Sequence, residues 1–153
     1  MPYSKVKPIT ILMADDDEDD RLLTQDALAE SRVLNELHFV EDGVELLEYL
    51  ERKGKFEDKN SSPRPGLILL DLNMPRMDGR EALQAIKGNS NLKGIPVVIL
   101  TTSKQEEDMV KGYDLGAASY ITKPVTFDGL VELMKTLGKY WVEFVELPST
   151  FND

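Results

Sequence analysis

The segment Leu67-Ile68-Leu69-Leu70-Asp71-Leu72-Asn73-Met74-Pro75-Arg76-Met77-Asp78-Gly79 sets four apolar residues directly before an acid, and turn-forming residues follow. A short continuous apolar run that comes after Pro65-Gly66 predicts a strand buried on both faces, as in a parallel sheet. Asp71 then stands at the carboxyl end of a central strand, where open α/β sheets place their ligand crevice. Asp71 by itself could equally cap the turn before the next helix.

Other strand-like runs also end in polar residues, which favours the crevice. Residues 9–14 lead into acids at every position from 15 to 20, more than one helix N-terminus needs for capping. The apolar residues 97–100 are followed by Thr101-Thr102-Ser103, and residues 119–122 are followed by Lys123 and a proline. Carboxylates, a hydroxyl and a lysine at separate strand ends predict a site for a hard cation beside an anionic group.

Strand and helix signals alternate along the chain, which predicts an α/β sandwich of five strands and five helices. We expect helices over residues 19–31, 44–52, 80–87 and 105–115 and from residue 126, with Gly116 as a left-handed cap of the fourth. The polar residues 54–64 are interpreted as a mobile loop. Helical spacing predicts that the first, second and fifth of these helices each bury one face. The residues on these faces are Leu23 and Ala27 in the first helix, Leu46, Leu47 and Leu50 in the second, and Leu130, Leu133, Met134, Leu137 and Trp141 in the fifth.

Composition sets further bounds. The 153 residues suit a single domain, with a core over about residues 9–140 and a C-terminal extension over residues 141–153. The chain has no cysteine, so disulfides and thiolate metal sites are excluded. It lacks a membrane-spanning stretch and the apolar core of a signal peptide, which predicts a cytoplasmic protein that does not bind membranes. The net charge of −10 argues against binding to nucleic acid.

With these motifs in this order, the chain resembles the receiver domain of two-component response regulators over roughly residues 9 to 140. Each motif is weak alone, but the acidic pair, Asp71 before Asn-x-Pro, the strand-end Thr101 and Lys123 before a proline are together specific. Residues 21–23, 101–104, 120–125 and 140–143 resemble the small stand-alone regulators that serve cyanobacterial and other bacterial phytochromes. The resemblance implies a doubly wound, flavodoxin-like parallel sheet with strand order 2-1-3-4-5.

The resemblance also implies the chemistry of the acids. Asp71 would accept a phosphoryl group from a sensor histidine kinase in a magnesium-dependent reaction. Asp16 and Asp71 would bind Mg²⁺ directly with the backbone carbonyl of Asn73, while Asp15 would act through water, and Mn²⁺ could substitute. Asp17 is expected to be solvated.

The remaining family positions concern the phosphate and the switch. Lys123 would pair with the phosphate, and the family makes the peptide bond to the following proline cis. Thr101 would move to hydrogen-bond a phosphoryl oxygen, and Tyr120 would turn inward behind it. Asn73 and Ser103 match the positions that tune the lifetime of the phosphate. The only histidine, His38, is expected to be a structural or surface residue.

The favoured function is a phosphorylation-switched signalling module, and not an enzyme beyond its own phosphoryl transfer and slow autodephosphorylation. Its donor would be a partner kinase, a phytochrome by resemblance, and too few residues follow Tyr140 for a DNA-binding output domain. One alternative is a magnesium-dependent phosphatase of the haloacid-dehalogenase kind, although Asn73 stands where that family needs a second Asp. Another is a receiver that is not phosphorylated and acts only as an interaction domain.

Apolar residues crowd positions 140–147 and fall on more than one side of any helix drawn through them. One stripe could cover the chain's own core. The phytochrome-type regulators that the chain resembles pair as homodimers through the fourth helix, fifth strand and fifth helix. We therefore expect a homodimer whose interface includes Met109, Tyr113, Tyr140, Trp141 and Phe144.

Overall fold

The computed structural model describes residues 9–149, with side chains over residues 9–138. The described chain forms five strands, β1 Ile11–Ala14, β2 Leu37–Val40, β3 Leu67–Asp71, β4 Val97–Thr101 and β5 Ser119–Thr122. They alternate with helices α1 Glu18–Ser31, α2 Gly43–Glu51, α3 Gly79–Lys87, α4 Lys104–Lys111 and α5 Phe127–Ser149, and a short 3₁₀ helix, η2 Gly54–Phe56, follows α2. None of the helices among the described residues is long and apolar enough to cross a membrane.

All neighbouring strands are parallel, in the order β2-β1-β3-β4-β5. The predicted fold class and strand order are therefore confirmed. The register pairs Ala14 with Leu70 and Thr101 with Thr122. It thereby brings the residues that follow β1, the end of β3 and the start of the segment after β5 to one edge of the sheet.

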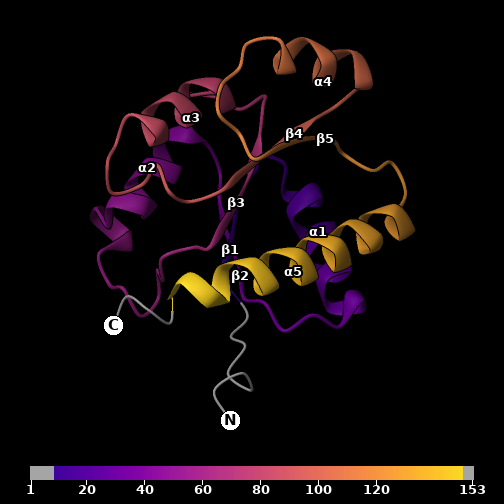
Figure 1. Cartoon of the computed structure of the whole chain (residues 1–153), viewed down its shortest axis with the longest axis horizontal. Helices are drawn as coiled ribbons and strands as arrows, with labels where there is room; N and C mark the ends of the chain where they lie inside the picture. Colours follow the sequence, from indigo (N-terminus) through magenta and orange to yellow (C-terminus); the bar gives the residue numbers. More distant parts are fainter. Residues whose placement is uncertain (1–8, 150–153) are drawn as a thin grey trace.

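Helices cover both faces of the sheet (Figure 1), with α1 and α5 side by side on one face and α2 and α3 on the other. Side chains along a strand alternate between faces. In β1, Ile11 and Met13 pack in the core beneath α1 and α5, while Leu12 and Ala14 pack beneath α2, α3 and α4. Two apolar cores thus hold the central strands, and burial on both faces explains their continuous apolar sequences.

Short polar side chains start the helices at the edge where the site forms. Asp17 accepts the backbone N–H groups of Asp19 and Asp20 at the start of α1. Asp78 forms a capping box with Glu81 at the start of α3, and Ser103 caps α4. Such caps satisfy donors that the first helical turn leaves unpaired, so the loops after β1, β3 and β4 have defined conformations.

Several predicted details are wrong. Leu23 is 47% exposed because the inward face of α1 consists of Thr24, Ala27, Leu28 and Ser31, and Leu23 lies at the border of that stripe. Helix α4 ends at Lys111 with Gly112 as its C-cap. Gly116 does have a left-handed φ of 86°, but it lies in the loop beyond the helix.

The segment over residues 54–64 was expected to be a mobile loop, and the structure shows it anchored. Phe56 in η2 packs against Tyr49 with ring centroids 5.2 Å apart. The Tyr49 hydroxyl donates to the carbonyl of Pro63 at 2.8 Å, and Ser62 is only 3% exposed.

Candidate functional site

Two buried carboxylates lie side by side at the carboxyl edge of the sheet. Asp15, directly after β1, is fully buried, and Asp71, the last residue of β3, is 4% exposed. Asp15 Oδ1 accepts the N–H of Asp17 at 2.9 Å, and Asp71 Oδ1 accepts the N–H of Asn73 at 3.3 Å. Each carboxylate is therefore oriented by the loop that follows it.

Asp16 completes a cluster that suits a cation. One carboxylate oxygen from each of Asp15, Asp16 and Asp71 lies within 4.8 Å of the others. Asp16 is exposed while the other two are buried, so the cluster opens to solvent on one side. Hard divalent cations prefer a few carboxylate oxygens together with water, and this donor set fits such an ion. Asp17, the cap of α1, lies outside the cluster and is exposed, in agreement with its predicted solvation.

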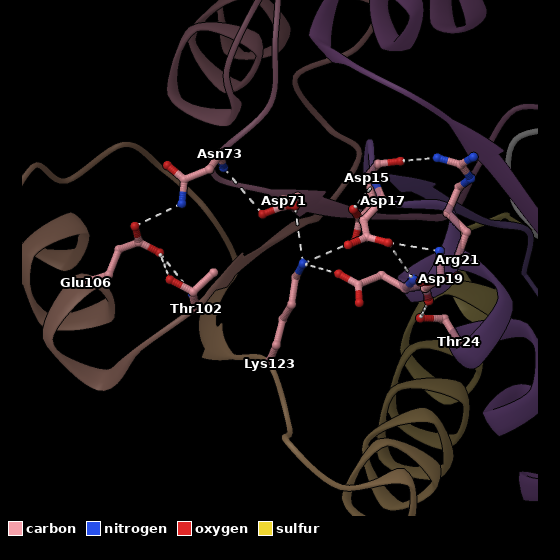
Figure 2. A network of polar contacts seen from close by, with 11 residues as sticks. Asp15, Asp17, Asp19, Arg21, Thr24, Asp71, Asn73, Thr102, Glu106 and Lys123 are labelled. Carbon is pink, nitrogen blue, oxygen red and sulfur yellow. Dashed lines mark hydrogen bonds and ion pairs between the residues drawn. The ribbon is translucent and has the colours of Figure 1, made fainter.

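Lys123 follows β5 directly, and its ammonium group points toward both Asp71 and Asp15 (Figure 2). Its Nζ lies 3.1 Å from Asp15 Oδ2 and 3.2 Å from Asp71 Oδ2. A third carboxylate, Asp20 Oδ2 in the first turn of α1, is closer still at 2.9 Å. The sequence displays Asp20 only as one more member of an acidic run. The Asp17 cap fixes where α1 begins and thereby places Asp20 in its first turn.

Burial and charge act against each other on these groups. Burial raises the pKa of Asp71 to about 6, the Lys123 charge opposes this rise, and the Asp15 charge adds to it. Burial also raises the pKa of Asp15, against the opposing effects of the Asp17 N–H and Lys123. Burial alone would lower the pKa of Lys123, but the hydrogen bond to Asp20 and the Asp71 and Asp15 charges outweigh it, so this pKa is raised. Lys123 therefore stays protonated.

Thr101 ends β4 on the far side of Asp71 and is fully buried. Its Oγ1 lies 3.2 Å from the carbonyl oxygen of Ser103 and 3.4 Å from Thr122 Oγ1. The Thr122 hydroxyl donates to Glu107 Oε1 at 2.9 Å. A line of polar contacts thus leads from the strand end to α4, and sequence reasoning missed both Thr122 and Glu107.

Glu107 is held by α4 itself. Its Oε2 lies 2.8 Å from Lys104 Nζ and 3.0 Å from Lys111 Nζ. The hydrogen bonds from these two lysines are the main reason why the pKa of Glu107 is lowered to about 2. The spacing of the three residues at i, i+3 and i+7 on one helix face was the available signal.

The two predicted lifetime-tuning positions have structural partners. The Asn73 amide donates to Glu106 Oε2 at 2.9 Å, and Glu106 Oε1 also accepts the N–H and the hydroxyl of Thr102. Ser103 Oγ accepts the N–H of Glu106 as the cap of α4. Glu106, visible in Figure 2, therefore bridges the loops after β3 and β4.

The other predicted residues lie at some distance from the acids or on the surface. Tyr120 in β5 is partly buried and packs against the core beneath α2, α3 and α4. Met109 and Tyr113 are 58% and 49% exposed, and the Arg80 guanidinium lies 4.3 Å from the Tyr113 ring centroid. His38 Nε2 contacts Glu36 Oε1 at 2.8 Å.

One detail that the family resemblance implied is wrong, and three predicted residues lie outside the described side chains. Among the described peptide bonds none is cis, so the bond between Lys123 and Pro124 is trans, contrary to the implied cis bond. The side chains of the predicted interface residues Tyr140, Trp141 and Phe144 lie outside those that the structure describes. The backbone there belongs to α5, which continues without a break past residue 140.

Known proteins with similar sequences agree with the fold and the site described above. The model of the response regulator receiver domain family matches residues 11–135. Response regulator Rcp1 of Synechocystis sp. is 42% identical over 142 residues, which cover 93% of this chain and 95% of that protein.

Several solved structures are similar over most of the chain, and two of them are 41% identical to it. The phosphorylated cyanobacterial phytochrome response regulator RcpA superposes with a TM-score of 0.77 at 41% identity, covering 89% of this chain and 95% of that one. The Mn²⁺-bound form of Rcp1 superposes with a TM-score of 0.74 at 41% identity, covering 89% and 96%. With its strand order, its acidic cluster and its strand-end Thr101 and Lys123, the chain belongs to the response regulator receiver domain family.

Proposed function

We propose that Asp71 of this receiver accepts a phosphoryl group from a sensor histidine kinase and that the modified protein signals through a changed surface. The observation that carries the proposal is the position of Asp71. It is a buried carboxylate at the end of the central strand, beside two further acids and one lysine.

In the proposed transfer, an Asp71 carboxylate oxygen forms a bond to phosphorus while the bond from phosphorus to the donor histidine nitrogen breaks. The donor imidazole leaves, and the acyl phosphate keeps the negative charge of the transferred group. Lys123, which is 3.2 Å from Asp71 Oδ2, is close enough to pair with a phosphoryl oxygen. Attack of water on phosphorus later restores the carboxylate and releases phosphate.

We propose Mg²⁺ as the resident cation, with Mn²⁺ as a substitute. Asp16 and Asp71 would bind it with the Asn73 carbonyl, and Asp15 would act through water. The mixed exposure of the cluster supports this assignment, because Mg²⁺ keeps several of its waters. When bound, the cation neutralises charge that develops during phosphoryl transfer.

The switch would use Thr101 and Tyr120. A phosphoryl group on Asp71 would draw the Thr101 hydroxyl away from Thr122 and Ser103, its partners in the present structure. Tyr120 would then fill the space behind it. The change would reach α4, β5 and α5, the face on which we propose that two copies pair through Met109, Tyr113 and the end of α5.

The kinase partner proposed here is a phytochrome, because a cyanobacterial phytochrome response regulator is among the similar solved structures. Such a reaction would take place in the cytoplasm, where ATP is available to the kinase. The amide of Asn73, which donates to Glu106, does not favour the phosphatase alternative, since that chemistry needs an acid at this position.

Intact mass spectrometry after incubation with phosphoramidate tests the proposal. We expect the wild-type protein to gain one phosphoryl group with Mg²⁺ present and none after chelation of the metal. Asp71→Asn removes the nucleophile while keeping its shape, and this variant should gain none. Equal incorporation into both proteins would contradict the assignment of Asp71.

A further inference from the structure

Lys123 is shared among three carboxylates, and only two of them belong to the cation cluster. Asp15 and Asp71 each contribute one oxygen to that cluster of three acids. Asp20 is not part of it, yet it has the shortest contact with Lys123, at 2.9 Å. The role of Asp20 therefore needs its own explanation.

The oxygens of Asp15 and Asp71 are already engaged in the described structure. In each residue Oδ1 accepts a backbone N–H of its own loop, and Oδ2 faces Lys123. A cation held directly by Asp71 and through water by Asp15 competes with the ammonium group for these two carboxylates. Two positive charges at such distances repel each other, so cation binding is easier when Lys123 has another partner.

Asp20 is well placed to be that partner. Its N–H lies 3.3 Å from Asp17 Oδ1, and its carbonyl oxygen accepts the Thr24 hydroxyl at 2.8 Å. These contacts use backbone atoms and leave the carboxylate free for Lys123. Its side chain is 37% exposed and that of Lys123 is 22% exposed, so the pair is partly shielded from water.

We infer that Asp20 is a positioning residue that retains the Lys123 ammonium when a divalent cation occupies Asp15, Asp16 and Asp71. From Asp20 the lysine can still reach a phosphoryl group on Asp71, since it contacts both carboxylates at once. The inference rests on the proposed cation site and adds a residue to it.

A simpler explanation is that Asp20 acts only as one negative charge among many near the site. A substitution at Asp19 distinguishes this effect of charge from an effect of the contact between Asp20 and Lys123. Asp19 is exposed, lies next to Asp20 in the first turn of α1 and carries the same charge, but it does not contact Lys123 in the described structure. Asp19→Asn therefore measures the effect of charge alone, whereas Asp20→Asn removes charge and contact together.

The experiment is titration calorimetry with Mg²⁺ on the whole chain, without a phosphoryl donor. Asp20→Asn should weaken Mg²⁺ binding about fivefold, because Lys123 then pairs with Asp15 and Asp71 alone and competes more strongly with the cation. Asp19→Asn should weaken it by less than about twofold, since exposed charges are screened by salt. Equal losses for the two variants would overturn the inference.

A second background isolates the contact. In a Lys123→Met protein the ammonium is absent, so Asp20→Asn and Asp19→Asn should have the same small effect on Mg²⁺ affinity. The inference would also be overturned if Asp20→Asn lowered Mg²⁺ affinity as much in the Lys123→Met protein as it does in the protein that keeps Lys123. Thermal unfolding without metal identifies any variant that fails to fold, and the comparison of Asp20→Asn with Asp19→Asn does not need the Lys123→Met background.

The two proposals fail in different ways. If the wild-type protein binds no Mg²⁺, the proposed cation site is wrong. If the wild-type protein binds Mg²⁺ and the two single variants behave alike, the site stands and only the role of Asp20 is lost.

Discussion

Thr122→Val tests the polar connection between the strand end and α4. Valine keeps the shape of threonine and its preference for strands. The substitution removes the hydroxyl that donates to Glu107 Oε1 at 2.9 Å and lies 3.4 Å from Thr101 Oγ1. Glu107 is 7% exposed, so water replaces the lost donor incompletely.

The expected magnitude follows from the two contacts. A hydrogen bond to an ionised group stabilises a fold by roughly 1.5–3 kcal/mol, and a contact as long as that with Thr101 adds little. Since Glu107 keeps its two lysine partners, we expect the lower end, a loss of about 1.5 kcal/mol in the free energy of unfolding. In a domain of this size that corresponds to a fall in Tm of roughly 3–6 °C.

Urea unfolding at pH 7, followed by far-UV circular dichroism without metal, measures this loss. The control is the same substitution in a Glu107→Gln protein, where the hydroxyl no longer faces a charge and the loss should fall to about 0.5–1 kcal/mol. A loss below about 0.5 kcal/mol in the wild-type background would refute the reasoning. So would an equal loss in both backgrounds.

Three further predictions use the same structure. Because burial raises the pKa of Asp71 to about 6, protons compete with the cation below that pH, and calorimetry should show Mg²⁺ affinity falling as pH drops from 7.5 to 5. Because the folded protein binds the Asp71 proton more tightly than the unfolded chain does, protonation of Asp71 stabilises the fold. This contribution to the free energy of unfolding is complete below pH 3.8 and is lost as pH rises through about 6. Asp71→Asn should therefore stabilise the metal-free protein at pH 7.5 by about 1–2 kcal/mol in urea unfolding, whereas a loss of stability would contradict this sign. Asp42→Ala should cost about 2 kcal/mol in the same assay, because Asp42 caps α2 through the Glu45 N–H and binds Arg76 Nε at 2.8 Å, and an unchanged midpoint would exclude both roles.

The strand ends were predictable because they depend on features that the sequence displays directly. A continuous apolar run predicts a buried parallel strand, and parallel strands bring their carboxyl ends to one edge. The sequence therefore predicts that Asp15, Asp71, Thr101 and Lys123 share one site. The strand order came from the family resemblance rather than from periodicity.

Details that depend on the start or end of a helix were harder to predict. Asp20 reaches Lys123 because Asp17 caps α1, and six consecutive acids do not reveal which of them is the cap. Likewise α4 ends at Lys111 with Gly112 as its C-cap, whereas the second glycine, Gly116, suggested a later end. The error at Leu23 has another origin, since the bounds of α1 were predicted to within one residue. The buried stripe of α1 is centred on Thr24, Ala27 and Leu28, and a small rotation of that stripe moves Leu23 to the surface.

Contacts between side chains of different elements were not predictable from local patterns. Phe56 packs against Tyr49 and turns a polar segment into an anchored one. Thr122 and Glu107 meet because β5 packs against α4. Neither contact leaves a periodic signal in the sequence, since each joins two elements across a loop.

The central claim is that Asp71 forms the acyl phosphate, and chemical trapping locates the modified residue most directly. The protein is treated with phosphoramidate and Mg²⁺ and then with borohydride, which reduces an aspartyl phosphate to homoserine. Tandem mass spectrometry of the peptides should find homoserine at position 71 alone. Homoserine at Asp15, Asp16 or Asp20, or a phosphate that resists borohydride on Thr101 or Ser103, would contradict the account.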